Sequence, residues 1–453
     1  MSAAPASGTQ RPDPSIAGGS GRLLQALGVA FGLAIIIGNT IGIGILRTPG
    51  EIALRLPSVP LFLGVWVLGG LYALLGALSL AELGAAIPRS GGQYVFVKRA
   101  LGSYPGFVTG WSDWLSTCAT LAAVGIVLGE YAGPLVPALG GREHATAIFV
   151  VLLFSLLQWR GIRLGDATQQ FTSLLKAIAL LALACAAFLL VSNATPAAEP
   201  ATVPSGFAFV AAAVVAFQSV IFTYDGWTGP IYFGEEVKDP GRDVPRAMIG
   251  GVLLVLFIYL ALNIAFLRVV PIADMAGDPF VAATAASRIF GTNGDTILRA
   301  VMIVSLLAAA NANLLMASRV PFALSRDRML PAGVTRVNAG GTPEVSLFAS
   351  TLVTLGFVVT NTFDTVLAII AFFFVANYVL SFTSLFVLRR REPDLARPFR
   401  VPGYPFTTGI ALLGSVAFLV AAVLGDAANS LRALALLAIS VPAYLVIRRR
   451  SAR

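Results

Sequence analysis

Apolar runs of about 16–28 residues recur along the whole chain, and an α-helix needs about 20 apolar residues to cross a bilayer. The runs lack the roughly ten-residue alternation of apolar and polar side chains that marks a membrane β-barrel. They therefore predict an all-α membrane protein. Twelve transmembrane helices are predicted, near residues 24–46, 60–87, 104–132, 145–160, 171–192, 206–233, 247–268, 297–318, 345–360, 364–388, 407–425 and 431–447.

The segments outside the runs are short. Residues 1–23 are rich in Pro, Gly, Ser and Ala, which predicts a flexible arm, and the run that follows is too long for a signal peptide. The connector 193–205 is rich in Pro and Ala and is predicted to be an outer loop. Residues 279–290 form a short amphipathic stretch, which fits a helix on the outer surface and a plain loop equally well.

Basic residues are distributed unevenly among these segments. Twelve spans place both termini on one side of the membrane. If that side is the cytoplasm, 23 of the 31 Lys and Arg residues lie in inner segments and seven lie in outer ones. Because basic residues concentrate in cytoplasmic loops, we predict a multi-pass protein of the cytoplasmic (inner) membrane with both termini inside. Residues 448–453 then form a cytoplasmic tail.

The amino-acid composition supports a membrane protein and argues against several classes of function. The 453 residues are 57% hydrophobic and only 12% charged, and soluble proteins carry about twice that charge. Loop orientation explains the net charge of +9 without a nucleic-acid partner. His144 is the only histidine, and Cys118 and Cys185 both lie in apolar runs. The sequence therefore predicts no metal site, no cofactor, no disulfide and no catalytic residues.

Two of the runs are interrupted by residues that break helices. The first run holds three glycines before a proline, and the sixth holds an aspartate, two glycines and a proline: Gly38, Gly42, Gly44 and Pro49, then Asp225, Gly226, Gly229 and Pro230. Close helix packing alone would explain Gly38 and Gly42. The two breaks, however, are five helices apart, which is the spacing of two five-helix repeats of opposite topology.

We therefore predict a 5+5 inverted-repeat transporter fold with helices 1 and 6 unwound at mid-membrane. The first repeat covers 24–192, the second covers 206–388, and two C-terminal helices cover 407–447. Unwound backbone costs several kcal/mol per unpaired group in a bilayer unless protein, water or ligand satisfies it. Free N–H groups at a half-helix start suit a carboxylate, and free carbonyls suit an ammonium group. An amino acid carries both groups on one carbon.

Four segments resemble the amino acid–polyamine–organocation (APC) superfamily of transporters, most closely its prokaryotic amino acid permeases. They are GNTIGIGILRTPG in the first span, AELGAAIPRSGGQYVFVKRALG after the second, Lys176 in the fifth, and FTYDGWTGPIYFGEEVKDPGRDVPRAM through the sixth. The resemblance covers nearly the whole chain, and the second and fourth segments are its most specific parts.

This resemblance implies a substrate site at the first break, made by Thr40, Ile41, Gly42, Ile43 and Gly44. The amides of Ile43 and Gly44 would hold the substrate carboxylate. Many relatives carry Ser or Thr where this chain has Ile43, so a hydroxyl contact to the carboxylate is lost here.

At the second break, the resemblance implies that the carbonyls of Phe222, Thr223 and Asp225 receive the substrate amino group together with that of Thr40. Phe222 would also close over the substrate, while Trp227 and Thr228 would shape the side-chain pocket. Asp225 itself has two interpretations. It is either a cap for the following half-helix or a counter-charge for a cationic substrate.

Lys176 lies about two turns inside the fifth span, where an unpartnered charge costs several kcal/mol. Snorkelling to the nearby interface is one interpretation. The resemblance implies another, in which Lys176 occupies the place of a sodium ion in sodium-coupled relatives and contacts span-1 carbonyls near 36–39. Lys176 would then either release a proton and couple transport to it, or stay charged in an exchanger.

Three other polar features carry expectations. Residues 235–246 (EEVKDPGRDVPR) alternate in charge and form either a solvated loop or an inner-gate latch. Asn311 and Asn313 either line the pathway or hydrogen-bond between helices. Glu82 is expected to pair with cytoplasmic basic residues.

The resulting hypothesis is a secondary active transporter that moves L-amino acids, with neutral ones favoured, by alternating access. It would work with protons or by exchange, and its partners would be the amino acid, protons in the first case, and membrane lipid. A polyamine or cationic amino acid transporter is the alternative, with Asp225 as the acidic group. An amino acid sensor would need an output domain, an intramembrane enzyme would need paired catalytic groups, and an ATP-driven pump would need a nucleotide loop.

Overall fold

The computed structural model describes residues 23–42, 44–191, 202–360, 363–425 and 427–451. The predicted arm 1–23 therefore lies outside the described residues except for its last residue. Most of the connector 193–205 and the last two residues of the tail 448–453 also lie outside them.

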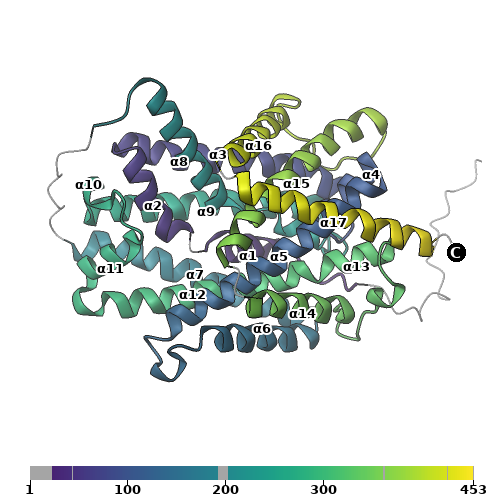
Figure 1. Cartoon of the computed structure of the whole chain (residues 1–453), viewed down its shortest axis with the longest axis horizontal. Helices are drawn as coiled ribbons and strands as arrows, with labels where there is room; N and C mark the ends of the chain where they lie inside the picture. The colour runs from purple at the N-terminus through teal and green to yellow at the C-terminus, as the bar shows by residue number, and fades with distance from the viewer. Residues whose placement is uncertain (1–22, 43, 192–201, 361–362, 426, 452–453) are drawn as a thin grey trace, which may run out of the picture.

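Helices make up most of the described chain, and its only β-pairing consists of three isolated bridges. The longer helices, shown in Figure 1, are α1 (Val29–Thr40), α2 (Gly44–Arg55), α3 (Val59–Ala86), α5 (Ser103–Ala132), α6 (Glu143–Trp159), α7 (Ile162–Leu190), α8 (Gly206–Tyr224), α9 (Pro240–Val269), α12 (Gly294–Ala317), α14 (Glu344–Thr360), α15 (Phe363–Arg391), α16 (Phe406–Gly425) and α17 (Ala427–Ser451). Shorter helices include α4 (Gln93–Leu101), α10 (Ile272–Met275), α11 (Val281–Phe290), α13 (Arg319–Arg326) and the 3₁₀ turn η3 (Gly229–Tyr232).

The helices agree with the predicted class of fold. Within the described residues, eight helical segments are long and apolar enough to cross a membrane, or nine if α1 and α2 count as one bent span. Helices α6 and α14 and part of α17 are apolar but shorter, and they coincide with three further predicted spans. The protein is thus an all-helical, multi-pass membrane protein, while the count of twelve crossings and the repeat stay predictions.

Two helices begin well before their apolar runs. Helix α7 starts at Ile162 and α9 starts at Pro240, whereas the predicted spans start at residues 171 and 247. Gly161 adopts a φ of +144° just before α7, a conformation that a side chain would disfavour. Proline suits the first turn of a helix, because its missing N–H has no partner there anyway. Apolar runs mark only the part of a helix that lies in the membrane, so they do not predict the polar first turns of α7 and α9.

The amphipathic stretch 279–290 is a helix rather than a plain loop. It forms α11, whose buried residues Val281, Ala282, Ala285 and Ala286 fall on one face. Helix α11 packs against α12, α2 and α9. It is therefore part of the packed bundle and not a detached surface helix.

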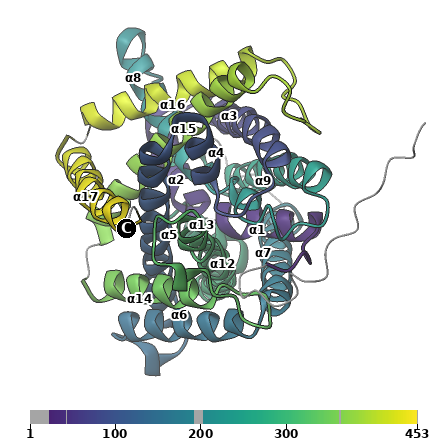
Figure 2. The same ribbon diagram turned by 90° about the vertical axis from the view of Figure 1, so that its right-hand side faces the viewer.

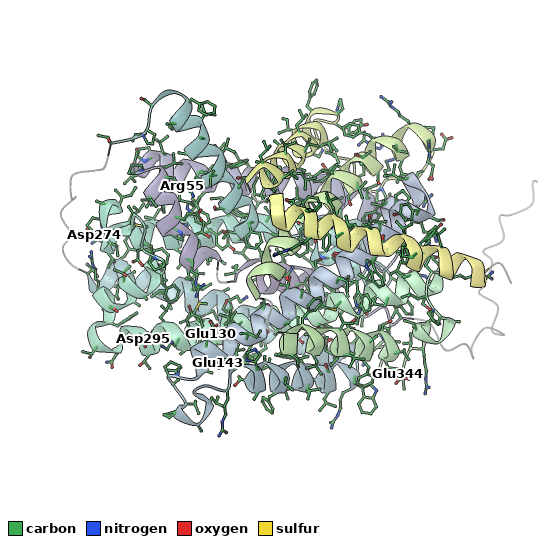
Figure 3. The ribbon with its side chains drawn as sticks, in the orientation of Figure 1. Arg55, Glu130, Glu143, Asp274, Asp295 and Glu344 are labelled. Atoms are coloured by element: carbon green, nitrogen blue, oxygen red, sulfur yellow. The ribbon has the colours of Figure 1, made fainter. Side chains whose placement is uncertain are left out.

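The centre of the bundle is occupied by α1, which packs on α7, α9 and α12 and has most of its residues buried. Figure 2 shows α1, α5, α12 and α13 in the middle of the bundle, with α6, α14, α16 and α17 at its margin. Along the bundle, Arg55, Asp274 and Asp295 lie at one end and Glu344 lies toward the other (Figure 3). We name these the outer end and the inner end, following the predicted orientation.

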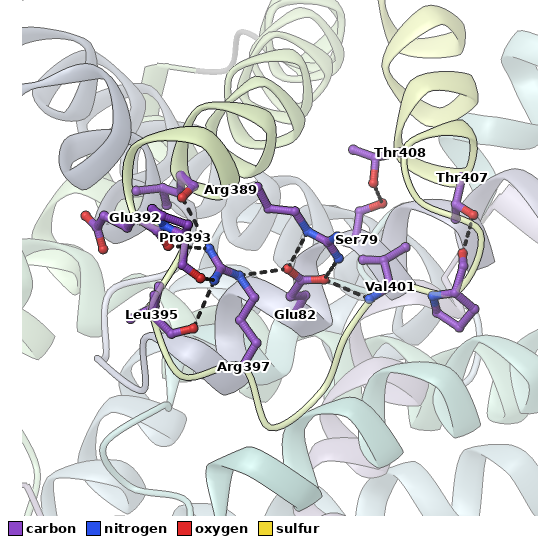
Figure 4. A network of polar contacts seen from close by, with 12 residues as sticks. Ser79, Glu82, Arg389, Glu392, Pro393, Leu395, Arg397, Val401, Thr407 and Thr408 are labelled. Carbon is purple, nitrogen blue, oxygen red and sulfur yellow. Dashed lines mark hydrogen bonds and ion pairs between the residues drawn. The ribbon is translucent and has the colours of Figure 1, made fainter.

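A buried carboxylate joins α3 to the segment after α15, as Figure 4 shows. Glu82, fully buried on α3, accepts hydrogen bonds from Arg389 Nε at 2.8 Å and from the backbone N–H of Val401 at 2.7 Å. Arg397 Nε lies 3.2 Å from the same carboxylate. The expected pairing of Glu82 with basic residues is confirmed.

Candidate functional site

The first predicted break is present in the structure. Helix α1 ends at Thr40, α2 begins at Gly44, and the two helices are bent by 50° relative to one another. Ile43, which the family resemblance implies as a carboxylate-binding residue, lies outside the described residues. The N-terminus of α2 and the C-terminus of α1 therefore face one short connection, and each brings unpaired backbone groups to it.

The second break meets the first. Helix α8 ends at Tyr224, and the chain continues through Asp225 and Gly226 to η3. Gly226 has a φ of +117°, and a Cβ atom there would lie 2.8 Å from the backbone nitrogen of Thr40. Only glycine combines this backbone conformation with such a close approach. The interrupted segments thus touch through their backbones.

A cavity of about 310 Å³ lies where the breaks meet, which is the lower end of the range for ligand pockets. Six of the predicted substrate-binding residues line it, namely Thr40, Gly42, Gly44, Phe222, Thr223 and Asp225. The side chain of Ile41 is fully buried away from it. Trp227 and Thr228 are also buried and are not part of the lining, and Trp227 stacks on Tyr378 at 5.0 Å between ring centroids.

Other lining residues were not predicted as site residues. They come from five elements and are Asn39, Arg47, Thr48, Thr120, Ala123, Val124, Leu306, Ala309, Asn313 and Phe374. Asn313 Nδ2 donates to Asn39 Oδ1 at 2.9 Å, and Asn39 Nδ2 donates to the carbonyl of Gly226 at 3.3 Å. Asn313 therefore both lines the cavity and bonds between helices. This chain of amides links α12, α1 and the second break.

Asn311, in contrast, packs between helices. Its Nδ2 donates to Gln169 Oε1 at 2.8 Å, and its Oδ1 accepts from Gln158 Nε2 at 2.9 Å. Asn311 is completely buried and is not among the lining residues. Of the two interpretations left open for Asn311, helix-to-helix bonding is the one that the structure favours.

One tyrosine hydroxyl lies within hydrogen-bond distance of carbonyls at the ends of both α1 and α8. The hydroxyl of Tyr259, on α9, lies 2.9 Å from the carbonyl of Thr40 and 2.9 Å from that of Thr223. A hydroxyl has one proton, so it donates to one of the two carbonyls at a time. The Oγ1 atom of Thr40 is buried and has no hydrogen-bond partner among the described residues. Thr40 can therefore accept a further hydrogen bond at its hydroxyl, and at its carbonyl when Tyr259 donates to Thr223.

Lys176 is fully buried and points at the end of α1. Its Nζ donates to the carbonyl of Gly38 at 2.8 Å and to that of Ile41 at 2.5 Å, and it lies 3.5 Å from that of Ile37. The contacts extend beyond the predicted residues 36–39, because α1 ends at Thr40 and the carbonyl of Ile41 turns into the break. Ser305 Oγ donates to the same Ile41 carbonyl at 3.2 Å. Because its ammonium group is buried and bonded to these carbonyls, Lys176 does not snorkel to the surface in this structure.

Asp225 has a partner of its own. The hydroxyl of Tyr378, on α15, donates to the Asp225 carboxylate. Asp225 also forms the C-cap of α8, with its N–H bonded to the Phe222 carbonyl. Tyr378 thus anchors the Asp225 side chain at the break, but a neutral hydroxyl does not cancel the charge of the carboxylate, so both interpretations of Asp225 stay predictions.

The inner end is closed by ion pairs between the segment after η3 and α13. Arg319 and Glu236 form a two-pronged pair at 3.0 and 2.8 Å, with their side chains 1% and 0% exposed. Beside them, Arg326 pairs with Glu235. The first two residues of the charged segment 235–246 thus pair with α13 instead of lying free in solvent, and their role as an inner-gate latch stays a prediction.

Asp327 extends this closure to α4. It accepts from Arg89 at 3.0 Å, from Lys98 at 2.7 Å and from the Tyr94 hydroxyl at 2.8 Å. Burial alone would raise the pKa of Asp327, but these hydrogen bonds and the charge of Arg89 outweigh it and hold the pKa below its usual range. Asp327 is therefore ionised and paired at neutral pH.

We expect Asp327→Asn to lower the melting temperature at pH 7 and to have little effect at low pH. A depressed carboxylate pKa stabilises the folded state fully above the unfolded value of about 3.9, and that stability is lost as pH falls through the folded pKa. Melting curves of both proteins from pH 7 to pH 3 measure this. Asp295→Asn, in an exposed pair at the outer end, is the control. A difference that persists unchanged to pH 3 would contradict this assignment.

The cavity opens toward the outer end. Arg47 and Thr48 line both the cavity and a second hollow of about 350 Å³, whose other walls include Glu51 and Asp278. The Phe222 side chain is 38% exposed, so it does not cover the cavity in this state. The cavity thus continues into the hollow at the outer end, while ion pairs hold the inner end together.

Known proteins are similar in sequence to this chain over almost its whole length. The family model described as amino acid permease matches residues 24–441. The serine/threonine exchanger SteT of Bacillus subtilis is 28% identical over 440 residues, covering 95% of this chain and 98% of that protein. Large neutral amino acids transporter small subunit 2 of Oryctolagus cuniculus is 29% identical, covering 86% and 74%.

Asc-type amino acid transporter 1 of Mus musculus is also 29% identical, over 84% of this chain and 73% of its own length. All three relatives are named as transporters or exchangers, and none is an enzyme. The family match extends from the start of the first predicted span into the last one, and it includes both breaks and Lys176. The chain therefore belongs to the amino acid permease family of the APC superfamily of transporters.

Proposed function

We propose that this protein is a secondary active transporter that binds L-amino acids, neutral ones foremost, and moves them across the cytoplasmic membrane by alternating access. The observation that carries the proposal is the cavity at the meeting point of three helix ends. The positive end of α2 begins at Gly44, while the carbonyl ends of α1 and α8 lie at Thr40 and Thr223. A zwitterion fits this arrangement, with its carboxylate toward α2 and its ammonium toward the carbonyls.

The two breaks also support the predicted 5+5 inverted repeat, because α1–α2 and α8–η3 belong to the first and sixth predicted spans. In such a fold, one five-helix unit rocks against the other around a fixed site. The outward-facing cavity and the inner latch of Glu235 and Glu236 agree with one state of that cycle. Both termini lie in the cytoplasm in this proposal.

The charges around the cavity favour neutral over cationic substrates. Asp225 is the only carboxylate among the lining residues, and Tyr378 already donates to it. Arg47 adds a positive charge to the same lining. The charge of Arg47 offsets that of Asp225, so the described lining has no net negative charge to attract a polyamine, and that alternative is less well supported. The names of the relatives, a serine/threonine exchanger and a large neutral amino acids transporter, support the same choice.

The contacts of Lys176 indicate which ion could drive transport. Its ammonium group fills the space beside the α1 end with a fixed positive charge and binds carbonyls that a metal cation would otherwise need. We therefore propose sodium-independent transport, driven by protons or by exchange.

Thermal stabilisation of the purified protein by a panel of amino acids tests the proposed substrate class. A ligand that binds the folded state raises the melting temperature by mass action. We expect stabilisation by neutral L-amino acids, no effect of the same compounds after amidation of the carboxylate, and no effect of polyamines. Stabilisation by polyamines alone would contradict the proposal.

Uptake into proteoliposomes then separates the two coupling modes. Uptake that requires unlabelled amino acid inside indicates exchange, and uptake driven by an imposed pH gradient into empty vesicles indicates proton symport. Uptake that requires a sodium gradient would contradict the assignment of Lys176.

A further inference from the structure

Arg47 occupies the boundary between the cavity and the outer hollow. It lies on α2 three residues after Gly44, so both residues and Thr48 face the same side of the helix. All three line the cavity, and Arg47 and Thr48 also line the outer hollow. A molecule that enters from the outer end must therefore pass this guanidinium before it reaches the start of α2.

The guanidinium has no ion-pair partner among the described residues. Its contacts are the ring of Phe280, with 6.0 Å from Cζ to the centroid, and the hydroxyl of Tyr131. Both contacts hold the side chain in place, and neither neutralises its charge. The side chain is exposed to the cavity side of α2.

The carboxylates nearby are bound by other groups. Glu51, one turn further along α2, accepts from Arg55 at 3.4 Å and from Ser219 at 3.1 Å. Asp278 accepts from the backbone N–H of Phe280 at 2.8 Å and from Thr284 at 2.6 Å. Neither carboxylate forms an ion pair with Arg47, so its guanidinium keeps N–H donors for a molecule that enters the cavity.

We propose that Arg47 is a carboxylate-binding residue at the outer mouth of the substrate cavity. A guanidinium group presents paired N–H donors that match a carboxylate, and the positive end of α2 adds to its attraction from the same side. The proposal rests on the proposed function and specifies which substrates the site accepts. The carboxylate has two sources, the α-carboxylate of any entering amino acid or the side-chain carboxylate of a dicarboxylic one.

The test compares Arg47→Gln and Arg47→Lys with a control of the same charge, Arg142→Gln. Arg142 is an exposed arginine just before α6 and lines neither the cavity nor the outer hollow. Dissociation constants are measured by calorimetry for L-serine, L-glutamine and L-glutamate with each purified variant. We expect Arg47→Gln to weaken binding at least about tenfold, as befits a lost charge-assisted hydrogen bond, and Arg47→Lys to weaken it less. Arg142→Gln is expected to bind as the wild type does.

The panel separates the two sources of the carboxylate. A similar loss for all three amino acids identifies the α-carboxylate, and a loss for glutamate with serine and glutamine unchanged identifies the side-chain carboxylate. Melting temperatures without ligand confirm that each variant is folded. Equal affinities of Arg47→Gln and Arg142→Gln for every probe would overturn the proposal alone. Wild-type protein that binds none of the tested amino acids would instead overturn the proposed function.

Discussion

Lys176→Ala is expected to abolish amino acid uptake in proteoliposomes. The substitution removes the ammonium group that holds the carbonyls of Gly38 and Ile41 at the end of α1. A buried carbonyl left without its donor costs about 1–3 kcal/mol, and the carbonyl of Ile41 keeps Ser305, so the variant should lose about 1–3 kcal/mol of stability in this state. Because these carbonyls belong to the break that lines the cavity, the site should lose its geometry before the protein unfolds.

Transport and stability are measured on the same preparation. Lys176→Met keeps most of the side-chain volume and isolates the charge, and Lys238→Ala, at an exposed lysine after the second break, is the control. Uptake should disappear in both Lys176 variants and persist in Lys238→Ala. Full activity of Lys176→Ala with an unchanged pH dependence would refute a role of Lys176 in transport.

Arg319→Met is expected to destabilise the protein by about 3–5 kcal/mol, which is the usual cost of leaving one member of a buried ion pair without its partner. Glu236 would keep a charge at a position that is 0% exposed, with no other cation bonded to it among the described residues. Arg319 also donates to the carbonyl of Leu315 and to Ser318 Oγ, and after the substitution the Leu315 carbonyl still accepts from Ser318 Oγ at 2.9 Å.

A double variant identifies the cause. Arg319→Met with Glu236→Leu removes both charges, and we expect it to regain much of the lost stability. The exposed pair of Arg99 and Glu392 supplies the matched control, in which Arg99→Met should change stability by no more than about 1 kcal/mol. Melting temperatures in detergent give the comparison. A double variant no more stable than Arg319→Met would show that packing, and not the charge, dominates at this position.

Most of the fold could be predicted from the sequence because membrane helices depend on local composition. The apolar runs located the helices, and the glycines and prolines located both breaks. Helices α4 and α13 were missed, since they are short and partly polar and lie at the inner end, where no apolar run marks them. Helices α6 and α14 coincide with apolar runs of the sequence, and they are shorter than the eight long apolar segments.

The site was predicted only in part. The glycines and prolines mark both breaks, and the family resemblance implies Thr40, Gly44 and Thr223 as site residues, which line the cavity in the structure. Tyr259 and Arg47 could not, because their roles depend on which helices pack together. Tyr259 sits in an apolar run where nothing local distinguishes it from a core residue. Arg47 was counted only as an outer basic residue, although an arginine next to a glycine-rich break is a usable signal.

The contacts of Glu82 tie α16 and the segment before it to the core. The carboxylate on α3 takes its cations from the end of α15 and from the segment that leads into α16, and Ser79 bonds to Thr408 on α16 at 3.0 Å. A version of the protein that ends near residue 391 would leave Glu82 with Arg389 but without Arg397 and the N–H of Val401. Helix α16 and the segment before it are therefore no detachable appendage, and engineering that removes them must also replace these donors to Glu82.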